Sequence, residues 1–408
     1  MSKVLPFRAL RPQSDLAAAV AAPPYDVLSS DEARLAVAGL PHSFLHVTKS
    51  EVDMPADLSI YDASVYEKAK SNLQAMIGDG VLFQDENPCY YIYELIMDGR
   101  SQTGLVGSSS VDDYENDIIK KHEFTRPEKE QDRINHIRIT GAQTGNVFLA
   151  YRNVAALDKM IARWKTDHQP VYDFTAPDAI QHRIWVINQP ESVESIRTIF
   201  EKEVPCTYIA DGHHRAASAA KVRKALGAEA GPEADSFLTT LFPANELKIM
   251  PYNRVVKDLN GLDVGELISA LQEDFMVASS DKPVDPPALH EFGMYLEGKW
   301  YHLTAKKGTY SKDPIGVLDV SILSSLVLEK ILGIADQRTD KRIDFVGGIR
   351  GLKELERRVD SGEMKVAYSF YPVSIEQLFD IADSGNVMPP KSTWFEPKLR
   401  DGLLTHLI

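Results

Sequence analysis

The chain has 408 residues, of which 44% are hydrophobic and 25% are charged, the composition of an ordinary globular protein. Its 45 basic and 59 acidic residues give a net charge of −14, which excludes sequence-independent nucleic-acid binding because that function needs a basic surface. No apolar run has the length of a membrane span, and the two cysteines lack a CxxC spacing, so we expect a reduced, cytoplasmic protein.

The N-terminal part of the chain is rich in proline and carries two candidate substrate contacts. Pro23 and Pro24 fix an extended backbone before Tyr25 and Asp26. These two side chains could reach a site, or the segment could be only a structural turn.

Strands and one long helix are expected next. Residues 43–48 read as a strand, on which His46 is a weaker candidate for substrate binding. The apolar spacing over residues 65–78 predicts an amphipathic helix. Asp98-Gly99, flanked by strand-like sequence, predicts a β-hairpin.

Residues 120–138 are dense in ionisable groups, with six Lys/Arg and four Asp/Glu. We expect the surrounding stretch to be helical at both ends, with a break at Pro127. It could be a solvated charged helix with internal ion pairs, or a loop that serves a phosphorylated substrate. Four of its side chains would then reach the site: His122, Glu123, Arg126 and Arg133.

Residues 206–226 read as a short strand, a tight turn and a helix that begins near His213 and ends before Gly227. A helix N-terminus has unpaired N–H groups and the positive end of the helix dipole, so it attracts anions. Arg215 adds a planar fork that suits phosphate or carboxylate. The alternative is a surface turn in which Asp211 caps the helix and the histidines are merely solvated.

The C-terminal half continues the mixture of strands and helices. Residues 236–241 and 247–250 are expected to be neighbouring strands, and Arg254 follows in a turn, where it could close a pocket or be an ordinary surface residue. Residues 318–332 predict a strongly apolar helix. Near the end, a cation and two hydroxyls follow a double proline and could hold a phosphate or form a docking segment: Lys391, Ser392 and Thr393.

The elements do not alternate regularly, which favours an α+β fold with mixed sheets and surrounding helices over a doubly wound sheet. We place a division between an N-terminal region, residues 1–230, and a C-terminal region, residues 231–408, or expect one composite domain. The chain has no Walker-type loop, GxGxxG, HExxH or GxSxG motif. Adjacent histidines point in different directions, so His213 and His214 do not predict a zinc site.

The chain resembles, almost from end to end, a bacterial and archaeal family catalogued as domain of unknown function 1015. The resemblance rests on six segments: APPYDV, SFLHVTKSE, KHEFTRPEKEQDR, YIADGHHRAASA, MPYNRVV and MPPKSTWFEPKL. Two features depart from the pattern: Asn253 stands where the resemblance leads us to expect a histidine, and the spacing within residues 122–133 is altered.

The DGHHR segment is also similar to the phosphate-binding box of the ParB/sulfiredoxin superfamily, which includes partition proteins, sulfiredoxins and free serine kinases. The resemblance implies a core of that type, with Asp211 assisting metal binding or proton transfer and four residues contacting phosphate: Gly212, His213, His214 and Arg215. It also implies serine or phosphoserine as substrate. Sulfiredoxin chemistry is not implied, because that box needs a cysteine.

We therefore expect a Mg²⁺-assisted phosphotransferase that acts on serine or phosphoserine with ATP, ADP or pyrophosphate. Asp211 would bind Mg²⁺, and His213 or His214 would take the hydroxyl proton, with Glu123 in reserve. Two alternatives stay open: a nucleotide-responsive binding protein without turnover, and a phosphatase that uses the same pocket. The sequence indicates no oligomeric state.

Overall fold

The computed structural model describes residues 1–408, which form two compact units: Met1–Leu247 with Pro397–Ile408 (unit 1), and Lys248–Glu396 (unit 2). Unit 2 is an insertion whose first and last strands, β13 (Ile249–Met250) and β20 (Trp394–Phe395), pair with each other. The division differs from the expected one after residue 230, because β12 (Ser236–Pro243) hydrogen-bonds on both edges to strands of unit 1.

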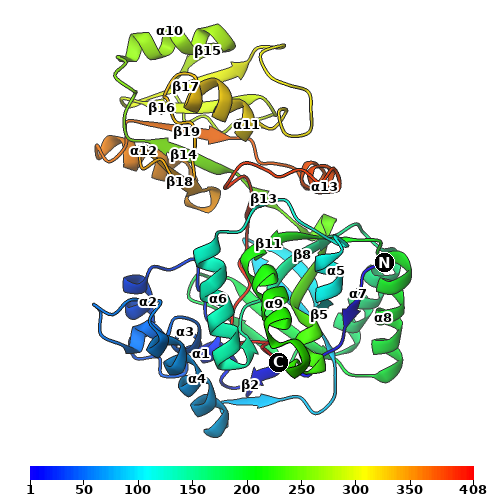
Figure 1. The fold of residues 1–408 in the computed structure, drawn as a ribbon. Coiled ribbons are helices and arrows are strands. Elements are labelled where there is room, and N and C mark those ends of the chain that lie inside the picture. The colour runs from blue at the N-terminus through cyan, green and yellow to red at the C-terminus, as the bar shows by residue number, and fades with distance from the viewer. The chain divides into compact units, whose positions relative to one another are not determined.

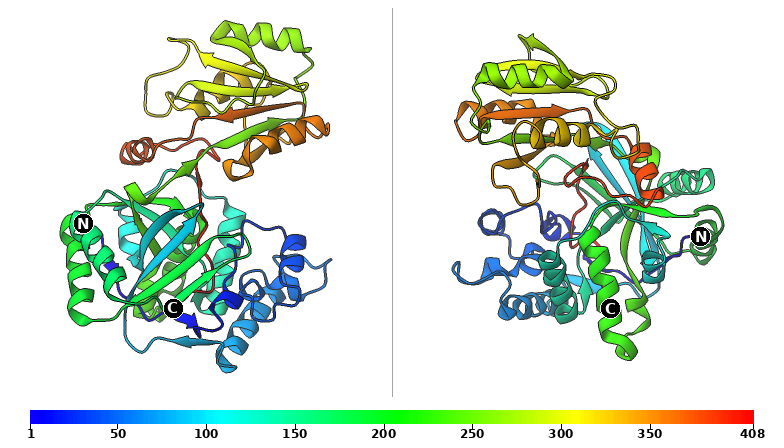
Figure 2. Two further views of the ribbon diagram at one scale, coloured as in Figure 1. Left: turned by 180° about the vertical axis from the view of Figure 1, so that it is seen from behind. Right: turned by 45° about the horizontal axis from the view of Figure 1, so that its top comes forward.

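A nine-stranded mixed sheet forms the centre of unit 1, in the order β6-β11-β8-β12-β5-β4-β10-β9, with β1 paired to β5 (Figure 1). The pairs β11–β6 and β12–β8 are parallel and the others are antiparallel. The left view of Figure 2 shows these strands from behind. Their bounds are β1 (Val4–Leu5), β4 (Tyr90–Met97), β5 (Arg100–Ser110), β6 (Ile119–Lys120), β8 (Val147–Tyr151), β9 (Tyr172–Thr175), β10 (Gln181–Ile187) and β11 (Thr207–Asp211).

Helices surround this sheet. Those that follow its strands are α5 (Val111–Glu115), α6 (Pro127–Thr140), α7 (Ala155–Asp167), α8 (Pro190–Glu203) and α9 (His213–Leu226). Ala216, Ala219 and Ala220 of α9 are buried in the core, and their small side chains let the helix pack closely against both α6 and the sheet. Pro127 is the first residue of α6, which confirms the expected break at this proline.

The N-terminal part of unit 1 forms a second, smaller core. Its helices are α1 (Ala17–Val20), α2 (Ser30–Ala36), α3 (Leu45–Thr48) and α4 (Ala63–Gly78). In two short sheets, β2 (Leu10–Pro12) pairs with β3 (Leu82–Gln84), and β7 (Ala142–Gln143) pairs with β21 (His406–Leu407). The strand expected at residues 43–48 is wrong, because this segment forms α3. Phe44, Leu45 and Val47 are buried on it, and the Thr48 hydroxyl donates back to the carbonyl of Phe44, a helical i−4 contact.

Unit 2 contains a six-stranded antiparallel sheet in the order β15-β17-β16-β19-β14-β18. Its strands are β14 (Tyr252–Val256), β15 (Phe275–Ser280), β16 (Glu291–Leu296), β17 (Lys299–Ala305), β18 (Ile343–Gly347) and β19 (Val366–Phe370). Its helices are α10 (Val264–Asp274), α11 (Asp319–Leu323), α12 (Gly351–Asp360) and α13 (Ile375–Asp383). The two sheets with their helices confirm the α+β fold class.

The hairpin at Asp98-Gly99 is confirmed: both residues have positive φ and join β4 to β5. Three details differ from expectation. β12 and β13 are not neighbours, because they belong to different sheets. Arg254 lies within β14 and not in a turn, and α11 passes into a π-helical turn at Ser324–Glu329 in place of one regular helix. The helices include none with the length and apolar character that a membrane crossing requires.

The insertion arrangement predicts that unit 1 folds by itself if its C-terminal segment is kept. Replacing residues 248–396 by a short Gly-Ser linker should leave one cooperative thermal transition in far-UV circular dichroism, because β13 and β20 already bring the two connections together. Residues 1–247 alone should lose this transition, since they lack Leu403 and Leu404, which are fully buried in unit 1. Equal behaviour of the two variants would contradict the arrangement.

Candidate anion-binding site

The site is built around the junction where β11 ends at Asp211 and α9 begins at His213. Gly212 between them is the N-cap residue, with a left-handed φ of 96°, and no side chain caps the helix. A Cβ at this position would lie 3.3 Å from the Cα of Val147, so both the conformation and the space favour glycine. The N–H groups of the first helical turn have no partner within the helix, and a bound anion could therefore accept from them.

Asp211 does not cap the helix, so the alternative interpretation of this residue is wrong. Its Oδ2 accepts a hydrogen bond from the Nζ of Lys398 at 3.0 Å. Burial alone would raise the pKa of Asp211, but the charges of Lys398 and Arg215 lower it well below its usual value. The carboxylate is therefore ionised at neutral pH.

The donor set around Asp211 does not fit a protein-bound Mg²⁺. The groups that act on this carboxylate are cations and a histidine, whereas Mg²⁺ prefers several oxygen ligands. The structure contains no group of three or more His, Cys, Asp or Glu side chains arranged to hold a metal ion.

Both histidines of the motif hold the loop between β6 and α6, which we call the 121–126 loop. The Nε2 of His213 accepts from the backbone N–H of His122 at 3.4 Å, and the Nε2 of His214 accepts from that of Arg126 at 2.9 Å. Because each Nε2 accepts, the proton of each neutral ring is on Nδ1. The two motifs that the sequence placed about 90 residues apart thus meet through main-chain hydrogen bonds.

His122 and His213 pack against each other in the interior, edge to face, with ring centroids 4.6 Å apart. Burial lowers the pKa of His122 to about 4, although Asp211 opposes the shift. Burial, followed by the proximity of His122, also lowers the pKa of His213 well below 6.5. Both rings are therefore uncharged at neutral pH, and the Nδ1 of His122 is buried without a hydrogen-bond partner.

Arg215 reaches from α9 to the proline-rich N-terminal segment. Its Nη1 donates to the carbonyl of Asn146 at 2.6 Å, and its Nη2 pairs with Oδ1 of Asp26 at 3.1 Å. Its Nε is buried and has no partner. A Cβ at Gly145 would lie 3.2 Å from that Nε, so the absence of a side chain there lets the arginine pass.

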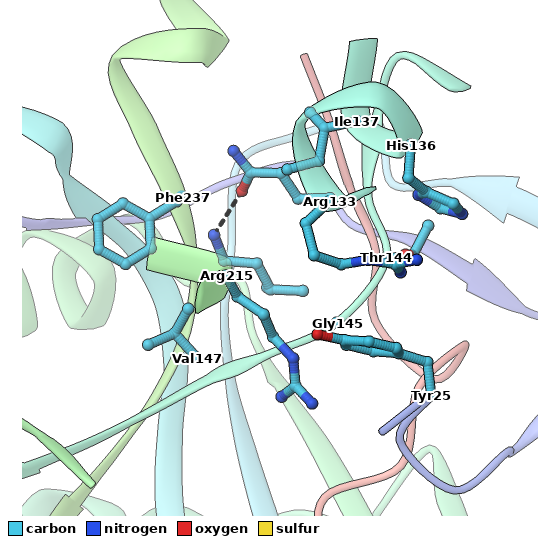
Figure 3. A pocket seen from close by; sticks show the side chains of 11 residues that line it. Tyr25, Arg133, His136, Ile137, Thr144, Gly145, Val147, Arg215 and Phe237 are labelled. Carbon is cyan, nitrogen blue, oxygen red and sulfur yellow. Dashed lines mark hydrogen bonds between the residues drawn. The ribbon is translucent and has the colours of Figure 1, made fainter. Parts of the chain in front are cut away.

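Tyr25 and Arg133 form the opposite wall. The guanidinium of Arg133 lies 4.0 Å from the ring centroid of Tyr25 (Figure 3). It also pairs with Asp132 at 2.8 Å. Burial raises the pKa of Tyr25 to about 12, so its hydroxyl stays protonated. Figure 3 shows the side chains that line a small cavity of about 30 Å³, among them Arg133 and Arg215.

The C-terminal segment of unit 1 completes the site with two residues that the sequence analysis missed. Lys398 pairs with Asp211, and Asp401 exchanges two backbone hydrogen bonds with Ala22, directly before the proline pair. Burial raises the pKa of Asp401 to about 7, against the opposing effect of Arg215, and its Oδ2 has no partner. Lys398 lies in the MPPKSTWFEPKL stretch, whereas Asp401 lies two residues beyond its end and carried no sequence signal.

The structure brings most of the candidate residues together in unit 1. The cluster contains Tyr25, Asp26, His122, Glu123, Arg126, Arg133, Asp211, Gly212, His213, His214 and Arg215. His46 is engaged elsewhere in this unit, with Nδ1 on Asp53 at 2.8 Å and Nε2 on the carbonyl of Leu40 at 3.2 Å. The proposed contacts of all these residues with a ligand stay predictions.

The remaining candidates belong to unit 2. Arg254 is fully buried, not a surface residue, and donates to the carbonyls of Lys391 at 2.9 Å and Pro390 at 3.1 Å. Burial lowers the pKa of Arg254 to about 9, although Tyr252 opposes the shift. Ser392 is also buried, and only Lys391 and Thr393 keep exposed surface. Arg254 thus fixes the loop that carries the other three, and their phosphate contacts stay predictions.

The buried, uncharged state of His122 predicts a pH-dependent stability. A histidine with a lower pKa in the folded state lets the unfolded state bind the proton first, so stability falls as the pH drops from about 6.5 to about 4. His122→Phe keeps the ring packing and removes this proton. The unfolding free energy of this variant, measured by urea titration, should fall less steeply with decreasing pH than that of the wild-type protein. The two slopes should differ by about 1.4 kcal/mol per pH unit over that range. An unchanged slope would contradict the assignment.

Comparisons with known proteins place this chain in a family. Partial likeness is found to a conserved hypothetical protein from Pyrococcus furiosus, with TM-score 0.36 and 17% identity over 73% of this chain and 93% of that chain. It is also found to a free serine kinase in complex with AMP, with TM-score 0.35 and 14% identity over 73% and 91%. A comparison with curated proteins gives no match. The family model described as "Protein of unknown function (DUF1015)" matches residues 4–321, so the chain belongs to that family, as the resemblance of its sequence implied.

Proposed function

We propose that the protein is a small-molecule phosphotransferase, acting on serine or phosphoserine with a nucleotide or pyrophosphate as the second substrate. One observation carries the proposal: an uncapped helix N-terminus lies beside an ionised carboxylate, a lysine and an arginine whose Nε is buried. The substrate class is supported by the resemblance of the DGHHR segment to the box of free serine kinases.

The arrangement suits phosphoryl transfer because that reaction depends on positioning and charge neutralisation more than on covalent chemistry by the protein. The N–H groups of the first turn of α9 would hold phosphate oxygens, and Arg215, whose Nε has no partner, would supply positive charge beside them. Lys398 would move from Asp211 to the transferred group, where it would neutralise the developing charge.

Asp211 is best suited to receive the proton of the acceptor hydroxyl. When the hydroxyl oxygen attacks the phosphoryl group, the new P–O bond forms, the bond to the donor's leaving group breaks, and the hydroxyl proton passes to the Asp211 carboxylate. A carboxylate with a low pKa can act in this way, as in protein kinases, because the proton becomes acidic only as the bond forms. His213 and His214 already accept hydrogen bonds from the 121–126 loop, which favours a positioning role for both.

The main alternative is a binding protein that responds to a nucleotide without turnover. The two hydrogen bonds between the histidines and the 121–126 loop favour it, because a ligand at the helix N-terminus could break them and release the loop. A phosphatase would use the same groups with water as the acceptor.

Substitutions at the junction should remove turnover without unfolding the protein. We expect Asp211→Asn and Arg215→Ala each to lower the rate of phosphoserine formation or loss, followed by phosphate-31 NMR, by about 100-fold or more. Arg223→Ala, in the last turn of the same helix, is the matched control and should keep the wild-type rate. Circular dichroism should show that all three variants are folded.

Two results would contradict the proposal. One is a wild-type rate in either junction variant. The other is the absence of any product from the wild-type protein with ATP, ADP or pyrophosphate, tested with both serine and phosphoserine. Ligand binding without product, seen as a raised melting temperature, would favour the binding protein.

A further inference from the structure

Phe124 is an exposed aromatic residue on a loop that is otherwise held in place. Its side chain is 73% exposed and makes no aromatic contact in the structure. An exposed phenylalanine forgoes the stabilisation that burial would provide, and most other aromatic residues of the chain are buried or half-buried. Single exposed apolar residues are common, so the surroundings of Phe124 must decide whether it has a role.

Those surroundings place Phe124 next to the junction of β11 and α9. The residues two positions before and after it, His122 and Arg126, are the ones whose backbone N–H groups are held by His213 and His214. Since consecutive Cα atoms are about 3.8 Å apart, the Cα of Phe124 lies within about 8 Å of both anchored residues. Thr125 is also fixed, by a hydrogen bond to Glu130 at 2.9 Å. The ring is therefore presented by a positioned backbone.

The same loop presents an uncommitted cation. The side chain of Arg126 is exposed and forms no ion pair or hydrogen bond in the structure, and the chain as a whole is acidic, with a net charge of −14. A flat apolar surface and a free guanidinium, both beside an anion site, match the two parts of a nucleotide. A planar base can stack on the ring, while phosphates attract the cation. Pyrophosphate offers nothing for an aromatic ring to bind.

We propose that Phe124 is the stacking residue for the base of a nucleotide whose phosphates lie at the N-terminus of α9, with Arg126 beside them. This inference rests on the proposed function, and it selects a nucleotide over pyrophosphate as the second substrate. His213 and His214, which lie on the helix that binds the phosphates, would then hold the 121–126 loop in the position where Phe124 contacts the base.

The test compares a ligand that has a base with one that lacks it. Dissociation constants of ADP and pyrophosphate would be measured by isothermal titration calorimetry for the full-length wild-type protein and for Phe124→Ala, Phe124→Leu and Phe124→Trp. We expect Ala and Leu to weaken ADP binding about ten-fold or more, Trp to preserve it, and all three to leave pyrophosphate binding unchanged. Tyr61→Ala removes another exposed aromatic ring, ahead of α4, and should change neither constant.

The outcomes separate this inference from the proposed function. If Phe124→Ala binds ADP as tightly as the wild-type protein does, or weakens ADP and pyrophosphate equally, stacking is refuted. Binding of pyrophosphate by the wild-type protein would still support the phosphate site. If the wild-type protein binds neither ligand, the proposed function fails and the inference fails with it.

Discussion

The carboxylate of Asp211 at the end of β11 is paired with a cation that comes from the far end of the chain. Asp211 is paired with Lys398, 187 residues later, after the whole of unit 2 has been inserted. Both side chains are partly exposed, 33% for Asp211 and 18% for Lys398, so the pair fixes the position of the two charges and contributes little to stability. The anion site is therefore complete only when the C-terminal segment has returned to unit 1.

A buried network holds that returning segment. The Nε of Arg400 donates to the Nε2 of His182 at 3.3 Å, so the proton of the neutral ring is on Nδ1 and is donated to the hydroxyl of Tyr93 at 2.9 Å. The backbone N–H of Arg400 donates to the same hydroxyl at 3.2 Å. Burial, followed by the charge of Arg400, lowers the pKa of His182 to about 3, which keeps this ring an acceptor. Lys398 and Asp401 flank Arg400 and are positioned by it.

The site contains charged side chains and also histidines that are uncharged because they are buried. Arg215 and Lys398 supply positive charge, and Asp211 stays ionised between them. His213, by contrast, is uncharged because it is buried, so it can accept a hydrogen bond from the 121–126 loop. A charged imidazole could not accept that bond. The histidines thus join the loop to the helix, while the arginine and lysine remain the cations available to a phosphate.

Much of the site could be predicted where the signals are local. The Asp-Gly turn, the alanine-rich helix and Gly227 lie within one short stretch, and the structure places β11 and α9 there. Lys398 and Asp401 could not be assigned, since nothing in their neighbourhood shows which carboxylate or arginine they face. The strand prediction for residues 43–48 is wrong for another reason. Apolar residues at 44, 45 and 47 fit either a strand or a helical turn, and packing in the second core stabilises the helix.

The most direct test is to locate the residues that bind an inorganic anion. Backbone amide NMR of the protein, titrated with pyrophosphate, reports on each N–H group separately. We expect large, saturable shifts of the amide protons of His213, His214 and Arg215, because these groups would donate to the phosphate oxygens. Saturable shifts elsewhere, with these three amides unmoved, would show that the start of α9 is not the anion site.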